Sequence, residues 1–133
     1  MIDYQFRLDF EVRDYECDLQ GIVNNAVYQN YLEHTRHEFL KQKGLNFSSL
    51  SERGINLVVI RAEIDYLYPL RSGERFYVGL NVERVSRLRF GFLQDIYLLP
   101  DNKPVLKAKI IGTTVNESGK PFLPDELAVL LDR

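Results

Sequence analysis

The segment from Asn24 to Lys43 reads NNAVYQNYLEHTRHEFLKQK, and its periodicity predicts one long helix. Large side chains recur along it at intervals of three and four residues, as on the buried face of an amphipathic helix. This face carries Tyr28, Tyr31, Leu32, Thr35 and Phe39. The opposite face carries Glu33, His37 and Lys41. Asn24 is typical of an N-cap and Gly44 of a C-terminal stop, so we expect the helix to lie between them.

The segments on both sides of this helix alternate with the period of two that predicts β-strands. Before the helix, apolar residues share one face of a strand expected over residues 4–13. After it, alternation predicts four strands, at residues 58–68, 76–82, 90–98 and 106–110. Turn residues such as Pro69 and Asp101-Asn102 separate them. A short terminal helix is expected within residues 121–131.

The order of these elements predicts an α+β fold in a single domain spanning residues 1–133. Strands joined by short turns pair antiparallel, because parallel pairing needs long crossovers. Only one long helix is available to cover a face of the sheet, so we expect a curved sheet wrapped around it. The remaining edges and the far face would invite pairing with a second subunit.

Composition excludes several classes of protein. The 133 residues are 45% hydrophobic and 27% charged, which is typical of a globular domain. A net charge of −2 gives no general attraction to nucleic acid. The single cysteine, Cys17, excludes an internal disulfide and a cysteine-rich zinc site. No secretory signal and no membrane-spanning run is present, so we expect a cytoplasmic protein.

The loop before the long helix carries the residues best suited to chemistry. Asp18 places a carboxylate just ahead of a helix N-terminus, whose first N–H groups are unsatisfied and carry partial positive charge. Such a terminus can stabilise a carbonyl oxygen that gains negative charge during acyl transfer. Gly21 lets the backbone approach a ligand closely. Capping is the alternative role for Asp18, and Asn24 and Asn25 suit caps and turns by side chain.

The run D-x-x-G-I-V-N-N-x-x-Y, from Asp18 to Tyr28, together with the later Glu33 and Arg36, resembles hotdog-fold thioesterases of the 4-hydroxybenzoyl-CoA thioesterase type. That group includes the Tol-Pal-associated acyl-CoA thioesterases. The resemblance implies a hotdog fold and hydrolysis of an acyl-CoA thioester at a site between subunits of a homodimer or homotetramer. It needs no metal or redox cofactor.

The same resemblance assigns roles to particular residues. Asp18 aligns with the catalytic aspartate, and the backbone N–H of Asn25 aligns with the group that polarises the thioester carbonyl. Basic residues around the junction of the third and fourth strands bind the CoA nucleotide in the family, which makes Arg87 and Arg89 candidates here. Tyr28, at the end of the motif, is a candidate for substrate contact, although aromatic residues at such positions are more often part of a core or an interface.

Two departures from the family leave the substrate carrier open. Many Tol-Pal-associated members have histidine at the position of Asn25, so a histidine-assisted mechanism is disfavoured. The Asn24-Asn25 pair is similar to plant acyl-carrier-protein thioesterases. However, Gln20 and Ile22 stand where those enzymes have their flanking asparagine and histidine. Acyl-carrier-protein thioesters therefore remain an alternative to acyl-CoA.

Two other functions compete with thioester hydrolysis. A hotdog hydratase or dehydratase would pair a histidine with an acid near the helix start, but His34 and His37 fall later on the helix. A non-catalytic acyl-binding protein with the same fold is the other alternative, because fold alone does not determine function.

Overall fold

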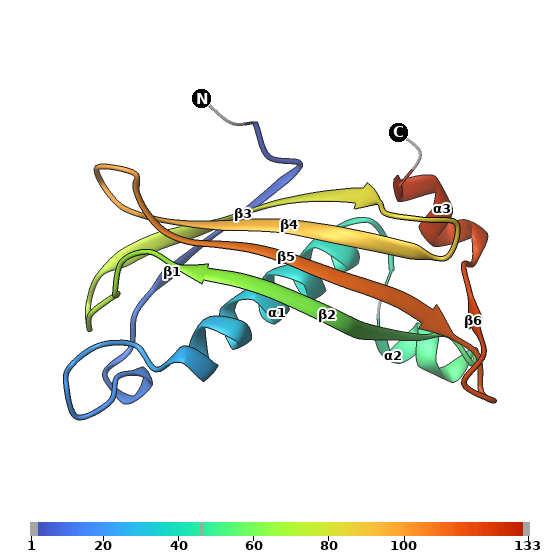
Figure 1. Cartoon of the computed structure of the whole chain (residues 1–133), viewed down its shortest axis with the longest axis horizontal. Helices are drawn as coiled ribbons and strands as arrows, with labels where there is room; N and C mark the ends of the chain where they lie inside the picture. Colours follow the sequence, from blue (N-terminus) through green and yellow to red (C-terminus); the bar gives the residue numbers. More distant parts are fainter. Residues whose placement is uncertain (1–2, 46, 132–133) are drawn as a thin grey trace.

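The computed structural model describes residues 3–45 and 47–131, and it contains a long curved sheet with a helix in its hollow (Figure 1). The strands are β1 (Phe6–Glu11), β2 (Asn56–Tyr66), β3 (Arg75–Arg84), β4 (Arg89–Leu98), β5 (Lys103–Val115) and β6 (Pro121–Phe122). The helices are α1 (Asn25–Gln42), α2 (Phe47–Glu52), α3 (Asp125–Leu131) and the short 3-10 turn η1 (Asp14–Glu16).

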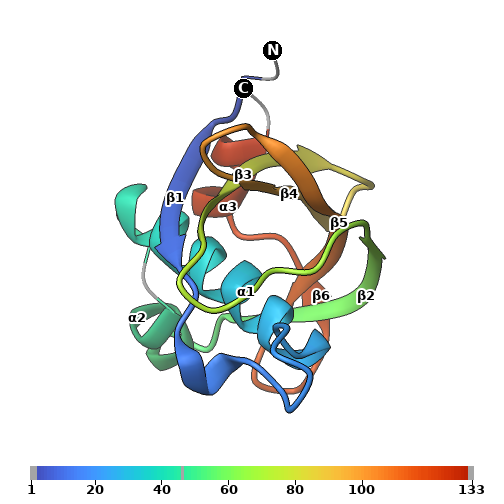
Figure 2. The same cartoon turned by 90° about the vertical axis from the view of Figure 1, so that its left-hand side faces the viewer.

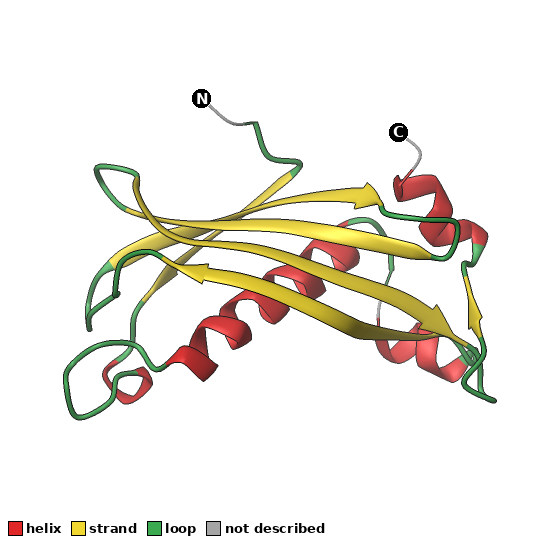
Figure 3. Cartoon of the chain, in the orientation of Figure 1, coloured by secondary structure: helices red, strands yellow, loops and turns green. Residues whose placement is uncertain are grey.

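The sheet is antiparallel, with strand order β1-β3-β4-β5-β2 and with β6 added to the end of β5. Seen end-on, it curls around α1 (Figure 2). The helix lies along the concave face, and the convex face carries no helix over its middle (Figure 3). This confirms the predicted α+β hotdog architecture.

The long helix forms as the sequence predicts. Asn24 is its N-cap, and the Asn24 side chain accepts a hydrogen bond from the Ala26 N–H at 2.9 Å. Gly44 follows its end with a φ of 81°, a conformation that glycine adopts without strain. All five residues of the predicted apolar face are buried, and Leu40 joins them. They pack on core side chains from β3, β4 and β5.

Strand β2 differs most from prediction. The alternation over residues 58–68 predicts a half-buried strand, but most of β2 is exposed, including Val59 at 54% and Ile60 at 45%. Two causes combine. The register with β5 shifts between Val59 and Arg61, and β2 is the last strand of the sheet, so one of its edges has no neighbouring strand. Helix α2, which the sequence did not reveal, contacts β2 near its start.

Candidate functional site

Asp18 lies in a tight turn between η1 and α1. Its backbone carbonyl accepts a hydrogen bond from the Gly21 N–H at 3.0 Å, and its N–H donates to the Ile22 carbonyl at 2.9 Å. The Oδ1 atom of Asp18 accepts from the Gln20 N–H at 2.8 Å. Gly21 has a φ of 79°, which allows the sharp reversal. The turn therefore fixes the Asp18 carboxylate on an exposed loop, and Oδ2 accepts no hydrogen bond from the described residues.

The N-terminus of α1 follows this turn directly. Asn24 uses its side chain and its carbonyl to satisfy the N–H groups of Ala26 and Val27. The N–H of Asn25, the first residue of the helix, has no partner among residues 3–45 and 47–131. A free donor at the positive end of an 18-residue helix can polarise a carbonyl oxygen.

The loop is anchored to the connection between β2 and β3. The Val23 N–H donates to the Leu70 carbonyl at 2.9 Å, and Ile22 forms an isolated bridge with Arg71. Tyr28 is buried at 3% exposure, and its phenol oxygen accepts a hydrogen bond from the Leu70 N–H at 2.9 Å. Burial raises the pKa of Tyr28. Tyr28 thus anchors the β2–β3 connection that holds the loop, and its contact with a substrate stays a prediction.

Glu16 is a second anchor of the loop, and the sequence motif assigned it no role. One oxygen of its carboxylate accepts hydrogen bonds from the Arg13 N–H and the Tyr31 hydroxyl, both at 2.8 Å. Its backbone carbonyl accepts from the Asn24 N–H at 3.2 Å. Burial, together with this carboxylate, raises the pKa of Tyr31. Glu16 therefore ties the Asp18 loop to α1 on the side opposite Leu70.

Arg87 and Arg89 are exposed at the opposite end of the sheet from Asp18. Arg89 pairs with Thr113 across β4 and β5, in the part of the sheet where β2 begins. The Asp18 loop is joined to the chain beyond the end of β2. Figure 1 shows the β3–β4 turn and the loop before α1 at the two ends of the molecule. A single subunit does not bring these predicted site residues together.

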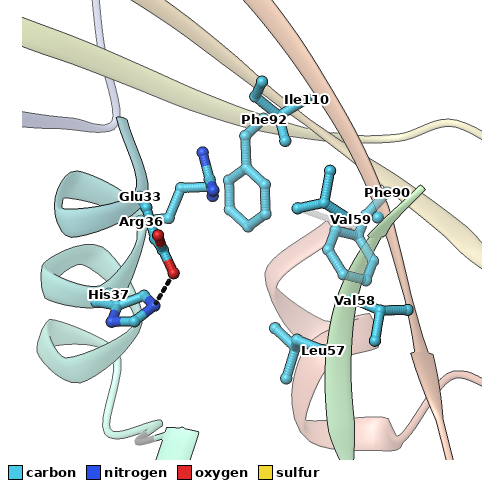
Figure 4. Close-up of a pocket in the computed structure, with 10 residues that line it drawn as sticks. Glu33, Arg36, His37, Leu57, Val58, Val59, Phe90, Phe92 and Ile110 are labelled. Atoms are coloured by element: carbon cyan, nitrogen blue, oxygen red, sulfur yellow. Dashed lines mark ion pairs between the residues drawn. The ribbon is translucent and has the colours of Figure 1, made fainter. Parts of the chain in front are cut away.

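A pocket opens between the second half of α1 and the start of β2, and we name it the α1–β2 pocket (Figure 4). It encloses about 430 Å³ of empty space, part of it open to solvent. Its apolar wall consists of Leu57, Val58, Val59, Phe90, Phe92, Ile110 and Gly112. Its polar wall consists of Glu33, Arg36 and His37 on α1.

Glu33 and Arg36 belong to the sequence motif, but no pocket was predicted beside them, and the i, i+4 spacing of Glu33 and His37 suggests only a surface pair. That pair is present, with 3.7 Å between a Glu33 oxygen and the His37 Nε2 atom. Burial lowers the pKa of His37. The signal that could have revealed the site is Gln94, a polar residue in the apolar row of β4. A buried amide needs a partner, and here the partner is Arg36.

Two observations concern other kinds of site. Over the ranges 3–45 and 47–131, no cluster of three or more histidine, cysteine, aspartate or glutamate side chains is arranged to hold a metal ion. None of the described helices is long and apolar enough to cross a membrane.

Replacing Gly21 tests the turn that holds Asp18. Gly21→Ala should lower the free energy of unfolding by about 1–2 kcal/mol, because an L-residue is strained at this φ. No atom lies within 4 Å of the added Cβ, so the effect is one of backbone conformation alone. Gly119→Ala is a matched control, with a φ of 81° and an equally open Cβ position in a turn next to β6.

Urea unfolding at one protein concentration should give similar losses of stability for the two variants. Only Gly21→Ala should also lower acyl thioester turnover, because only that turn carries Asp18. Equal turnover by both variants would show that the Gly21 turn has no part in the site.

Comparison with known proteins identifies the family. The profile of the Thioesterase-like superfamily matches residues 12–131. The chloroplast acyl-acyl carrier protein thioesterase ATL2 of Arabidopsis thaliana is 45% identical over 108 residues, which cover 81% of this chain but only 56% of the plant protein. A putative esterase of Aquifex aeolicus is 39% identical over 128 residues, covering 96% of this chain and 95% of that protein.

A solved structure supports the fold. The 1,4-dihydroxy-2-naphthoyl-CoA thioesterase Slr0204 of Synechocystis superposes with a TM-score of 0.90, over 95% of this chain and 94% of that one, at 19% identity. At this identity the likeness concerns the fold. The match over residues 12–131 includes the Asp18 loop, α1 and strands β2 to β6, so the chain belongs to the Thioesterase-like superfamily.

Proposed function

We propose that the protein hydrolyses an acyl thioester, with the Asp18 carboxylate and the N-terminus of α1 acting on the same carbonyl group. The observation that carries this proposal is a free N–H on Asn25 just after a turn that holds an exposed carboxylate. The N–H would stabilise negative charge on the carbonyl oxygen, and the carboxylate would deliver the attack.

Two versions of the chemical step fit this arrangement. As a general base, Asp18 takes a proton from water while the water oxygen bonds to the carbonyl carbon; the C–S bond then breaks and the thiolate takes up a proton. As a nucleophile, Asp18 bonds to the carbon itself, expels the thiolate and forms an anhydride that water hydrolyses. In heavy-oxygen water under single-turnover conditions, label enters Asp18 only in the second version, when water attacks the aspartyl carbon of the anhydride.

The exposed edge of β2 supports a homodimer. An edge strand with free backbone groups and exposed apolar side chains is a template for pairing, and β2 exposes Val58, Val59 and Ile60. The other edge strand, β1, has a charged residue at every second position, and charged edge strands discourage such pairing. Two copies of β2, paired antiparallel about a twofold axis near Ile60, would join the sheets. A tetramer built from such dimers is compatible with this arrangement.

This pairing would also complete the site. Antiparallel copies of β2 place the start of the partner's strand beside the end of the first, where the Asp18 loop lies. The α1–β2 pocket of one subunit then faces the Asp18 loop of the other. Arg87 and Arg89 on the partner's β3–β4 junction would lie about 14 Å from the first subunit's β2, counting three strand spacings. A CoA nucleotide can span such a distance.

The proposed role of Arg87 and Arg89 favours CoA as the carrier of the acyl group. Two arginines on an exposed junction suit the phosphates of CoA, since guanidinium groups bind phosphate with paired hydrogen bonds. The Arabidopsis relative is described as acting on acyl-carrier protein, whose pantetheine arm would reach the same loop, so both carriers belong in the test. Membership of the Tol-Pal-associated group stays a prediction from the motif.

The test is a thiol-release assay with acyl-CoAs of varied chain length and ring content, and with matching acyl-carrier-protein thioesters. We expect Asp18-dependent release of thiol from at least one series. Tight binding of acyl-CoA without hydrolysis would instead favour an acyl-binding protein, and hydration of an enoyl-CoA without thiol release would favour a hydratase.

A further inference from the structure

The α1–β2 pocket contains an arginine where an apolar acyl site would need none. Arg36 reaches from α1 toward Phe92 on β4, as Figure 4 shows, and the guanidinium carbon lies 6.0 Å from the centre of the Phe92 ring. The rest of the facing wall is aliphatic or aromatic. The pocket thus combines one fixed cation with a mainly apolar wall.

A buried amide holds this guanidinium in place. The Arg36 Nη1 donates to the Gln94 Oε1 at 3.0 Å, and the Gln94 Nε2 donates to the Leu32 carbonyl at 2.9 Å. Gln94 has no exposed surface, and both of its polar atoms are used in this chain of bonds. The amide therefore cannot turn without losing a hydrogen bond, so the arginine is positioned by the core of the sheet.

The charge of Arg36 is incompletely matched within the chain. Burial lowers the pKa of Arg36, but an arginine remains protonated at neutral pH. Among the described residues no carboxylate forms an ion pair with it, although the nearby charge of Glu33 acts on it and opposes the effect of burial. A guanidinium has five N–H donors, and Gln94 takes one of them. Donors remain for a ligand atom in the pocket.

We infer that Arg36 determines acyl specificity: the pocket takes the acyl group, and Arg36 donates a hydrogen bond to a hydroxyl or oxo oxygen that this group carries. The inference rests on the proposed hydrolysis and deepens it. A neutral oxygen fits better than a carboxylate, because Glu33 is one helical turn away and repels a second negative charge. The oxygen could stand on an open chain or on a ring.

The test compares matched thioesters with and without the oxygen. Hydroxydecanoyl-CoA isomers are measured against decanoyl-CoA, and hydroxybenzoyl-CoA against benzoyl-CoA, so the two arms separate a chain from a ring. We expect wild-type kcat/KM to favour the hydroxylated member of at least one pair by about 10- to 100-fold, the range for a hydrogen bond to a charged group. In Arg36→Met the ratio of the two kcat/KM values should fall towards one, whatever the change in turnover of the plain substrate.

Two further variants distinguish a loss of substrate preference from a loss of folding. Arg36→Lys keeps a donor for the Gln94 oxygen but loses the fork, so it should fold like wild type and retain part of the preference. Arg7→Met is the matched control, because Arg7 is exposed on the other edge strand, β1, and is paired with Asp9 at 2.9 Å, outside the pocket. Arg7→Met should leave the preference unchanged. An unchanged preference in folded Arg36→Met and Arg36→Lys would overturn the inference.

Calorimetric binding of the free decanoic and hydroxydecanoic acids, and of the benzoic pair, separates this inference from the proposed hydrolysis. Wild type should bind the hydroxylated acid of the preferred pair more tightly, and Arg36→Met should bind both members equally. If no thioester is cleaved but wild type and Arg36→Met still differ in their preference for the hydroxylated acid, the role of Arg36 in the pocket is supported and the proposed hydrolysis is wrong. Hydrolysis with no Arg36-dependent difference in either measurement rejects the pocket assignment alone.

Discussion

Asp18→Asn is expected to lower kcat/KM for the best acyl thioester by at least about 100-fold, the lower range of a lost general base or nucleophile. The fold should be unaffected. The Oδ1 of Asp18 accepts a hydrogen bond from the Gln20 N–H, and an asparagine oxygen can accept the same bond. What the substitution removes is the negative charge on an exposed loop, seven residues before Asn25 and its free N–H.

Initial rates of thiol release measure this effect, with circular dichroism and urea unfolding to verify the fold. Asp101→Asn is the control, because Asp101 is also exposed and also lies in a turn, but between β4 and β5. It should retain wild-type turnover. If Asp18→Asn keeps more than about a tenth of wild-type kcat/KM, too small a loss for general acid–base catalysis, Asp18 is not the attacking group or its base.

Ile60→Lys should dissociate the protein into folded monomers and abolish most of its activity. Ile60 is 45% exposed within one chain, so the monomer loses little burial. Near a twofold axis the two lysines would face each other, and like charges on paired strands repel. We expect activity to fall with the dimer, because each site would lack the partner's pocket and arginines.

Sedimentation velocity and turnover, measured at the same protein concentrations, test this prediction. Val129→Lys is the matched control, an equally drastic change at a 69% exposed position on α3. It should leave both assembly and turnover unchanged. A wild-type protein that is monomeric and active would rule out the dimeric site, and so would an Ile60→Lys monomer with full turnover.

The local part of the fold could be predicted because its signals are local. The long helix is marked by an N-cap at Asn24, by glycine at Gly44 and by a regular apolar face, and the structure confirms all three. Short turns predicted antiparallel strands, and these are also found. Helix α2 was missed because six residues are too few to show a helical period.

The parts that failed depend on contacts distant in sequence. The predicted buried face of β2 is wrong because edge position and a register shift are properties of the sheet, not of the strand. Arg36 and Gln94 are 58 residues apart, so their hydrogen bond left no local pattern. The family resemblance assigned Asp18, Arg87 and Arg89 to one site between subunits; strand topology places Asp18 and the two arginines at opposite ends of one subunit, so their meeting across an interface stays a prediction.

The proposed site requires two subunits, so subunit mixing tests it most directly. We expect Asp18→Asn and the double variant Arg87→Ala/Arg89→Ala each to be weakly active alone. The two variants are then unfolded together and refolded, so that mixed dimers form. If the Asp18 loop works with the partner's arginines, each mixed dimer regains one intact site. Thiol release at low substrate concentration should then rise well above that of either parent. Mixed dimers no more active than the average of their parents would contradict a shared site.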